Sequence, residues 1–175
     1  VLPAGRRTTV TAIDTADGPL TEAFAPQSVT LRLADPIDTT RGDLIAAASD
    51  APEPTQDLSG LVAWLAEKPL RVGARVLVKH GTRTVQGVVR DITGRLDLDA
   101  LAPVPTDTLE SNDIGRFFFF FNDTATTEIY TVSRRTGSFL LVDPQTGGTL
   151  AAGMVRAFGD FDEAAEQAAT VNWSI

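Results

Sequence analysis

The chain is 175 residues long, enough for one domain or two small ones, and a chain of this size can bury roughly 70% of its unfolded surface. It contains no cysteine, which excludes a disulfide framework, a cysteine-ligated zinc or iron–sulfur site and a thiol nucleophile, and predicts a cytoplasmic location. Its net charge of −8 and pI near 4.5 are the opposite of the basic surface that binds phosphate backbones, so no nucleic acid is expected as a partner.

The N-terminal sequence "VLPAGRRTTV" begins with Val1 in strand-like residues and has no apolar core of signal-peptide length. No stretch elsewhere approaches the roughly 18 apolar residues that cross a bilayer. We therefore expect a fragment that starts inside a domain, without a secretion signal and without membrane association.

Alternation of apolar and polar residues favours half-buried strands along much of the chain. In "SVTLRLAD", the apolar residues Val29, Leu31 and Leu33 share one face. Residues 46–60 are rich in proline, small and acidic residues, which is typical of a linker. These patterns place the end of one β-barrel at residues 1–48, a linker at 49–60 and a second barrel at 61–156.

The start of the second unit is ambiguous, because Leu58, Leu61, Val62 and Leu65 fit a helical stripe while alternation over 61–66 fits a doubly buried strand. Two hairpins follow. Val76 and Val78 lead to a His80-Gly81 turn, and an apolar run at 139–142 is punctuated by Asp-Pro and Gly-Gly before a second apolar run. The alanine- and glutamate-rich tail, residues 157–175, predicts a short helix capped by Asp160.

Residues 115–131, "GRFFFFFNDTATTEIYT", join five consecutive phenylalanines to a threonine-rich string. A strand with five phenylalanines needs burial on both faces, but the residues that follow supply no matching apolar partner. A membrane anchor needs a longer apolar run, and more basic flanking residues than Arg116 alone. Back-translation of 122–131 as AAT GAT ACG GCG ACC ACC GAG ATC TAC AC gives a flow-cell adapter used in short-read DNA sequencing, and a run of T encodes phenylalanine. We interpret residues 117–131 as translated adapter and exclude them from the expected fold.

Outside that segment, ordered motifs cover nearly all of residues 1–155. They are "LPAGR", "DGPLTEAFAPQSVTL", "DPIDTTRGD", "AWLAEKPLRVGARVLVKHGTRTV", "NDIGR" and "RRTGSFLLVDPQTGGTLAAGMV". In this order they resemble the C-terminal half of sulfate adenylyltransferase subunit 1, the GTPase subunit of the bacterial sulfate-activating enzyme. The resemblance implies an all-β fold with two antiparallel β-barrels of the translation-factor type, the first truncated, and a strand over 61–66.

Two features depart from the family pattern. Ser133 stands where the family usually carries Asn before its Arg-x-Thr-Gly. The strand expected after Gly115 is replaced outright by 117–131, which removes one strand from the second barrel. Because unpaired strand edges invite aggregation, we predict poor solubility.

The resemblance implies a subunit whose GTP hydrolysis drives formation of adenylylsulfate and diphosphate from ATP and sulfate, with sulfate adenylyltransferase subunit 2 as its partner. GTP and Mg²⁺ are expected only for the full-length protein, because the chain contains no G-x-x-x-x-G-K-[ST] loop. The fragment alone is predicted to bind no cofactor and to be inactive, and it lacks the adenylylsulfate kinase domain of some relatives. The alternative is a translation elongation factor whose C-terminal barrels bind aminoacyl-tRNA, against which acidity and the specific motifs argue.

No residue is predicted to be catalytic, cofactor-binding or metal-ligating. The single histidine, His80, excludes metal sites with two or more histidine ligands and any triad with a second histidine. It could act as a general base, but beside Gly81 in a predicted hairpin turn it is expected in a turn or facing a partner. The remaining candidates have structural interpretations. Asp97 and Asp99 are expected on a solvated strand face opposite Leu96 and Leu98, and Trp64 and Trp173 are expected as core or interface anchors. Arg134 and Arg135 are expected beside a strand start, and Arg41, Gly42 and Asp43 in a strand-end turn.

Overall fold

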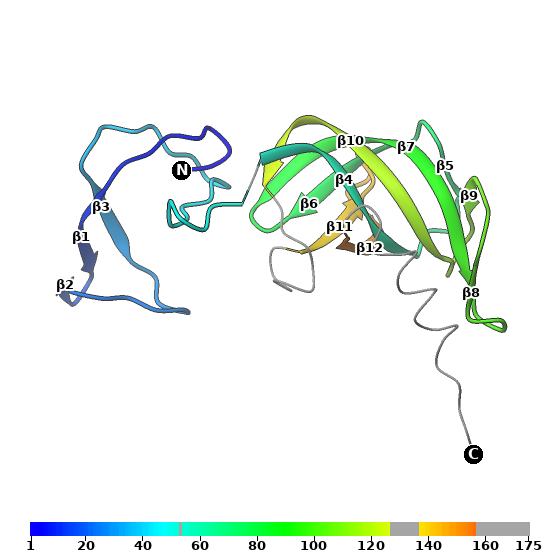
Figure 1. The fold of residues 1–175 in the computed structure, drawn as a ribbon, viewed down its shortest axis with the longest axis horizontal. Helices are drawn as coiled ribbons and strands as arrows, with labels where there is room; N and C mark the ends of the chain where they lie inside the picture. The colour runs from blue at the N-terminus through cyan, green and yellow to red at the C-terminus, as the bar shows by residue number, and fades with distance from the viewer. Residues whose placement is uncertain (53, 127–136, 157–175) are drawn as a thin grey trace, which may run out of the picture. The chain divides into compact units, whose positions relative to one another are not determined.

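The computed structural model describes residues 1–52, 54–126 and 137–156, and within 121–126 it describes the backbone alone. The chain divides into two compact units, Val1–Ala51 and Pro52–Ile175. Every regular element in the described ranges is a strand (Figure 1). Nowhere in these ranges is there a helix with the length and hydropathy that crossing a membrane requires.

The first unit is a small antiparallel sheet in the order β2-β1-β3. Its strands are β1 (Val10–Thr15), β2 (Gly18–Leu20) and β3 (Thr30–Leu33). In β3, Leu31 and Leu33 are half-buried and Arg32 is exposed, so the predicted alternation is confirmed. Leu2 and Leu44 add an isolated antiparallel bridge near the two ends of the unit. The three strands form an open sheet.

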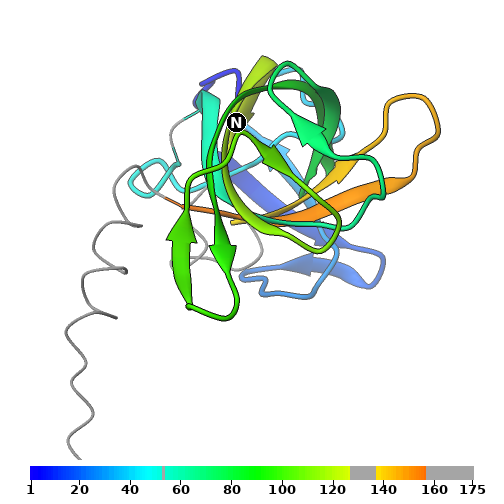
Figure 2. The same ribbon diagram turned by 90° about the vertical axis from the view of Figure 1, so that its right-hand side faces the viewer.

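The second unit is a closed antiparallel barrel of six strands. Around the ring the order is β10-β4-β12-β11-β6-β7, and β7 pairs with β10 to close it (Figure 2). The strands of this unit are β4 (Pro54–Trp64), β5 (Leu70–Arg71), β6 (Arg75–His80), β7 (Arg83–Asp97), β8 (Ala102–Val104), β9 (Thr108–Leu109), β10 (Ile114–Thr126), β11 (Ser138–Val142) and β12 (Thr149–Val155).

The barrel core is built from alternate residues of the ring strands, because successive strand side chains point to opposite faces. β6 shows the pattern plainly, with Val76 and Val78 buried between exposed or half-buried neighbours. The core cluster contains Leu58, Val62, Trp64, Leu70, Val76, Val78, Val85, Val89, Ile92, Leu109, Phe117, Phe119, Phe139, Leu141, Ala151 and Val155.

β4 resolves the ambiguity at the start of this unit in favour of a strand. Leu58, Val62 and Trp64 point into the core, while Leu61 on the opposite face is half-buried. The strand begins at Pro54, so residues 54–60, expected to be linker, lie in the barrel instead. Gly60 explains how: its Cα faces the carbonyl oxygen of Met154 on β12, where any side chain would collide. The linker prediction rested on prolines and small or acidic residues, whereas residues 54–60 belong to a strand that pairs with β10 and, from Gly60, with β12.

β10 corrects the expectation that residues 117–131 interrupt the barrel. Residues 117–126 lie in β10, which pairs antiparallel with both β4 and β7. Phe117 and Phe119 are 1% and 0% exposed, whereas Phe120, on the outward face, is 37% exposed. The requirement for burial on both faces was wrong, because a barrel strand buries only its inward side chains. The unpaired edge that motivated the solubility prediction is absent from this barrel, since β10 closes the ring.

Both predicted hairpins are confirmed. β6 and β7 join through a turn at Gly81, whose φ of +56° is readily adopted by glycine, and His80 pairs with Arg83 across it. β11 and β12 form the second, with Phe139 opposite Gly153. The predicted C-terminal helix in residues 157–175 lies outside the described residues, as do Tyr130 and Ser133.

Candidate functional site

The described residues hold no cluster of three or more His, Asp or Glu side chains that could bind a metal ion. His80 ends β6 on the same inward-facing line as Val76 and Val78, and it is only 9% exposed. The expected position beside a turn is correct, but a partner-facing role is wrong because the imidazole lies within the barrel. A histidine so placed is not accessible as a general base for an external substrate.

The other sequence candidates have structural roles where they are described. Trp64 is 3% exposed, and its indole Nε1–H donates to the carbonyl oxygen of Lys68 at 2.9 Å, as expected of a core anchor. Asp43 accepts a hydrogen bond from the Thr40 N–H at 2.9 Å through Oδ2, and Gly42 has φ +104°, so this Arg-Gly-Asp is a turn before the Leu44 bridge. Arg134, Arg135 and Trp173 lie outside the described residues.

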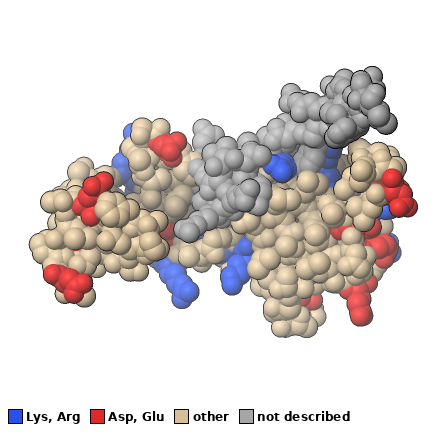
Figure 3. Space-filling model, turned by 90° about the horizontal axis from the view of Figure 1, so that it is seen from below, with Lys and Arg blue, Asp and Glu red and all other residues tan. Residues whose placement is uncertain are grey.

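One end of the barrel carries an acidic lobe, residues 95–113, which contains β8, β9 and their loops. Its acidic residues are Asp97, Asp99, Asp107, Glu110 and Asp113, and no Lys or Arg occurs from position 96 to 115. On the face of the molecule in Figure 3, Asp and Glu side chains gather at the right-hand end of the barrel unit. The lobe is therefore predominantly negative, with Arg95 at its base and Arg71 of β5 opposite Thr108 of β9.

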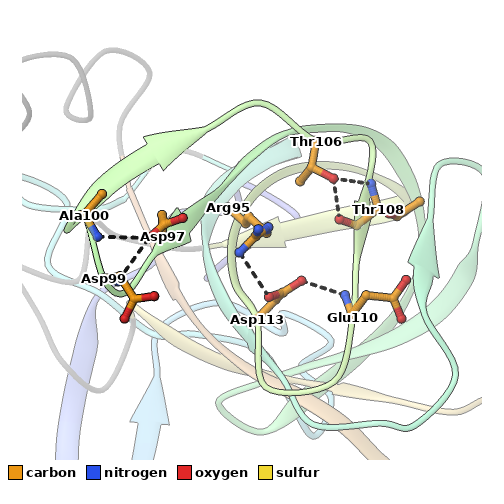
Figure 4. A network of polar contacts seen from close by, with 8 residues as sticks. All are labelled: Arg95, Asp97, Asp99, Ala100, Thr106, Thr108, Glu110 and Asp113. Carbon is orange, nitrogen blue, oxygen red and sulfur yellow. Dashed lines mark hydrogen bonds and ion pairs between the residues drawn. The ribbon is translucent and has the colours of Figure 1, made fainter.

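The β7–β8 hairpin forms the tip of the lobe, and Asp97 shapes its turn. Asp97 Oδ1 accepts hydrogen bonds from the backbone N–H groups of Asp99 at 3.0 Å and Ala100 at 2.9 Å (Figure 4). β7 ends at Asp97, so the expectation that Asp97 and Asp99 share a strand face was wrong. Aspartate side chains often accept hydrogen bonds from backbone N–H groups two and three residues later in a turn. The sequence "DLDA" is compatible with such a turn, but the alternation of apolar and polar residues favoured a strand.

A second polar cluster fixes the base of the lobe. Asp113 Oδ2 accepts a hydrogen bond from the Glu110 N–H at 2.8 Å, and its Oδ1 lies 3.8 Å from Arg95 Nη1 (Figure 4). The backbone of this turn is tied to β4, since the Trp64 N–H donates to the Asp113 carbonyl oxygen at 2.9 Å and the Asn112 N–H donates to the Trp64 carbonyl oxygen at 2.7 Å. The lobe is thus anchored to a strand of the closed ring.

The hydrogen bonds from Ala100 and then Asp99 lower the pKa of the Asp97 carboxyl, with a smaller contribution from the Arg95 charge. On the β11–β12 turn, the N–H groups of Thr146 and Gln145 lower the pKa of Asp143 in the same way. Carboxyls with lowered pKa values remain ionised at neutral pH and do not deliver protons as general acids. This arrangement suits recognition by charge and shape.

Comparison with known proteins agrees with this fold. Residues 58–156 match the family model described as GTP-eEF1A C-terminal domain-like. The chain is 44% identical over 157 residues to the bifunctional enzyme CysN/CysC of Mycobacterium tuberculosis, and 39% identical over 155 residues to that of Rhodopirellula baltica. It is also 38% identical over 155 residues to sulfate adenylyltransferase subunit 1 of Photobacterium profundum. Each match covers 89% of this chain.

The chain spans only about a quarter to a third of the length of these relatives, with 26%, 24% and 33% of each covered. Among solved structures, it resembles Sup35 complexed with GDP, with a TM-score of 0.73 and 19% identity over 91% of this chain and 40% of that one. At this identity the likeness shows the fold alone. The chain belongs to the GTP-eEF1A C-terminal domain-like family, with sulfate adenylyltransferase subunit 1 and CysN/CysC enzymes as its homologues.

Proposed function

We propose that the chain is part of the GTP-hydrolysing subunit of a sulfate adenylyltransferase. In that enzyme, GTP hydrolysis drives formation of adenylylsulfate and diphosphate from ATP and sulfate, a step of cytoplasmic sulfate assimilation towards cysteine biosynthesis. The observation that carries this proposal is 44% identity over 157 residues to a CysN/CysC enzyme. Identity of this extent reaches both units of the chain, including motifs that a shared translation-factor fold does not require.

The two β units act in this proposal as a scaffold. GTP and Mg²⁺ are held by a nucleotide-binding domain outside this sequence, and sulfate adenylyltransferase subunit 2 performs adenylyl transfer. The closed barrel supports the role, since six paired strands and a continuous apolar core give a rigid body on which surface loops keep a fixed geometry. The acidic lobe, in which Asp99, Asp107 and Glu110 are exposed, supplies a recognition surface and needs no catalytic partner.

Co-purification tests the proposal directly. The tagged chain is mixed with sulfate adenylyltransferase subunit 2 and, separately, with aminoacyl-tRNA, and complexes are separated by size exclusion at low and high salt. We expect a complex with subunit 2 and none with tRNA. Retention of tRNA that falls steeply with salt, without binding of subunit 2, would contradict the proposal and support an elongation factor that binds aminoacyl-tRNA.

A further inference from the structure

Two leucines at the hairpin tip, residues 97–101, have largely exposed side chains that do not contribute to the barrel core. Leu98 is 63% exposed and Leu101 is 74% exposed, the largest value among the described large hydrophobic side chains. Alternation predicted that Leu98 would lie on a strand face opposite the solvated face of Asp97 and Asp99. Instead, β7 ends one residue earlier, and both leucines belong to the turn of the β7–β8 hairpin. The ribbon of this hairpin extends beyond the ring (Figure 2).

The tip is held in one conformation. Asp97 caps the turn through two backbone N–H groups, and the hairpin is paired from Arg95 with Val104 to Asp97 with Ala102. Leu101 has φ +49°, a region that L-residues with a branched side chain rarely adopt. Glycine adopts this conformation without strain. The leucine side chain therefore lowers the stability of this chain, and burial within the chain does not compensate.

The charge around the tip indicates what can bind it. The lobe has five acidic residues, against which stand Arg95 at its base, 3.8 Å from Asp113, and Arg71 of β5, opposite Thr108 of β9. The tip itself, residues 97–101, carries Asp97 and Asp99 and no basic residue, and the whole chain has a net charge of −8. A second copy of this chain would bring like charges together, and nucleic acids carry phosphate charge of the same sign. The complementary surface is an apolar pocket with a rim of Lys and Arg.

We propose that the hairpin tip is a docking site that inserts Leu98 and Leu101 into an apolar, basic-rimmed pocket on a protein partner. This inference rests on the proposed function and assigns the pocket to sulfate adenylyltransferase subunit 2. The leucines supply the contact that excludes water, and Asp99 and its acidic neighbours accelerate and orient the encounter. Asp97 is a positioning residue that holds the turn.

The test measures the Kd for subunit 2 with Leu98→Ser, Leu101→Gly and the control Leu140→Ser. Leu140 is also partly exposed, at 38%, but lies on β11 outside the lobe. We expect the two tip variants to weaken binding about tenfold or more, as truncation of interface hot spots does, and the control to bind normally. The thermal midpoint of Leu101→Gly should be no lower than that of the wild-type chain, which separates docking from a structural role. Asp99→Asn should slow association and reduce its salt dependence.

Each outcome decides the matter. Normal binding by both tip variants would overturn the docking site and leave the proposed function standing. Failure of the wild-type chain to bind subunit 2 would contradict the proposed function together with this inference. A dimer of the chain that Leu98→Ser dissociates would show that a second copy occupies the tip, contrary to the assignment.

Discussion

Phe117 on β10 and Phe139 on β11 meet inside the barrel, with ring centroids 5.7 Å apart and ring planes inclined by 77°. The two strands lie on opposite sides of the six-stranded ring, so this edge-to-face contact spans the core. Phe117 also packs edge-on against Phe119 at 4.3 Å. Residues from the phenylalanine run thus complete the barrel core together with residues of the quoted motifs, such as Phe139.

Phe117→Ala is expected to destabilise the barrel by about 3–5 kcal/mol, because it opens a cavity at a site with 1% exposure. Phe120→Ala is the matched control: the same residue type on the same strand, but outward, where its ring is 5.5 Å from the Arg90 guanidinium. Its cost should be about 1 kcal/mol or less. Urea unfolding measures both, and equal losses would show that β10 does not have the described register.

Gly115→Ala should also destabilise the barrel, by about 1–3 kcal/mol, because the new Cβ overlaps the δ carbons of the fully buried Leu109. Shortening that partner should relieve the clash. The double variant Gly115→Ala with Leu109→Ala is therefore expected to lose less stability than the sum of the two single variants. Additive losses in chemical unfolding would argue against direct contact between these positions.

Acid should weaken the β7–β8 turn through Asp97. The pKa of Asp97 in the folded chain lies below the ordinary aspartate value of 3.8, so the stabilisation is present above pH 4 and is lost as the pH falls through the lowered pKa. Amide NMR shifts of Asp99 and Ala100 should report this transition at low pH. Asp97→Asn retains an acceptor oxygen without the titrating charge and should abolish it. A transition that persists in the variant would assign it to another group.

The 175-residue chain alone is expected to release no phosphate from GTP or ATP, because it lacks the glycine-rich loop and lysine that hold nucleotide phosphates. A phosphate-release assay with Mg²⁺ measures this, with heat-denatured chain as the background. Hydrolysis that co-elutes with the purified chain and exceeds this background would refute the proposal that this chain is a scaffold and that another domain holds the nucleotide.

Resequencing the source gene by a different chemistry is expected to return different codons for residues 117–131. The back-translated match to an adapter oligonucleotide is the reason. Recovery of the same DNA would show that the phenylalanine run is genuine. Its place in β10 does not depend on the outcome, since any residues with an apolar side chain at 117 and 119 satisfy the inward positions.

Local patterning predicted the strands well where apolar and polar residues truly alternate, as at Leu31 and Leu33 or Val76 and Val78. It failed at the phenylalanine run for a specific reason. A homopolymer places the same side chain on both faces, so it carries no information about which face is buried. The linker was overextended because prolines with small and acidic residues are typical of linkers, whereas residues 54–60 lie in β4, which pairs with β10 and β12. Gly60 allows the close approach of β12 at that point.

The sequence by itself determined the all-β class, the absence of a phosphate-binding loop and the resemblance to sulfate adenylyltransferase subunit 1, because these depend on composition, period and motif order. Only the tertiary structure decided that β10 closes the ring, that His80 lies inside it and that Leu98 and Leu101 stand in solvent. Those facts depend on hydrogen-bond register between strands distant in the chain and on where β7 ends, and neither is encoded in the spacing of neighbouring residues.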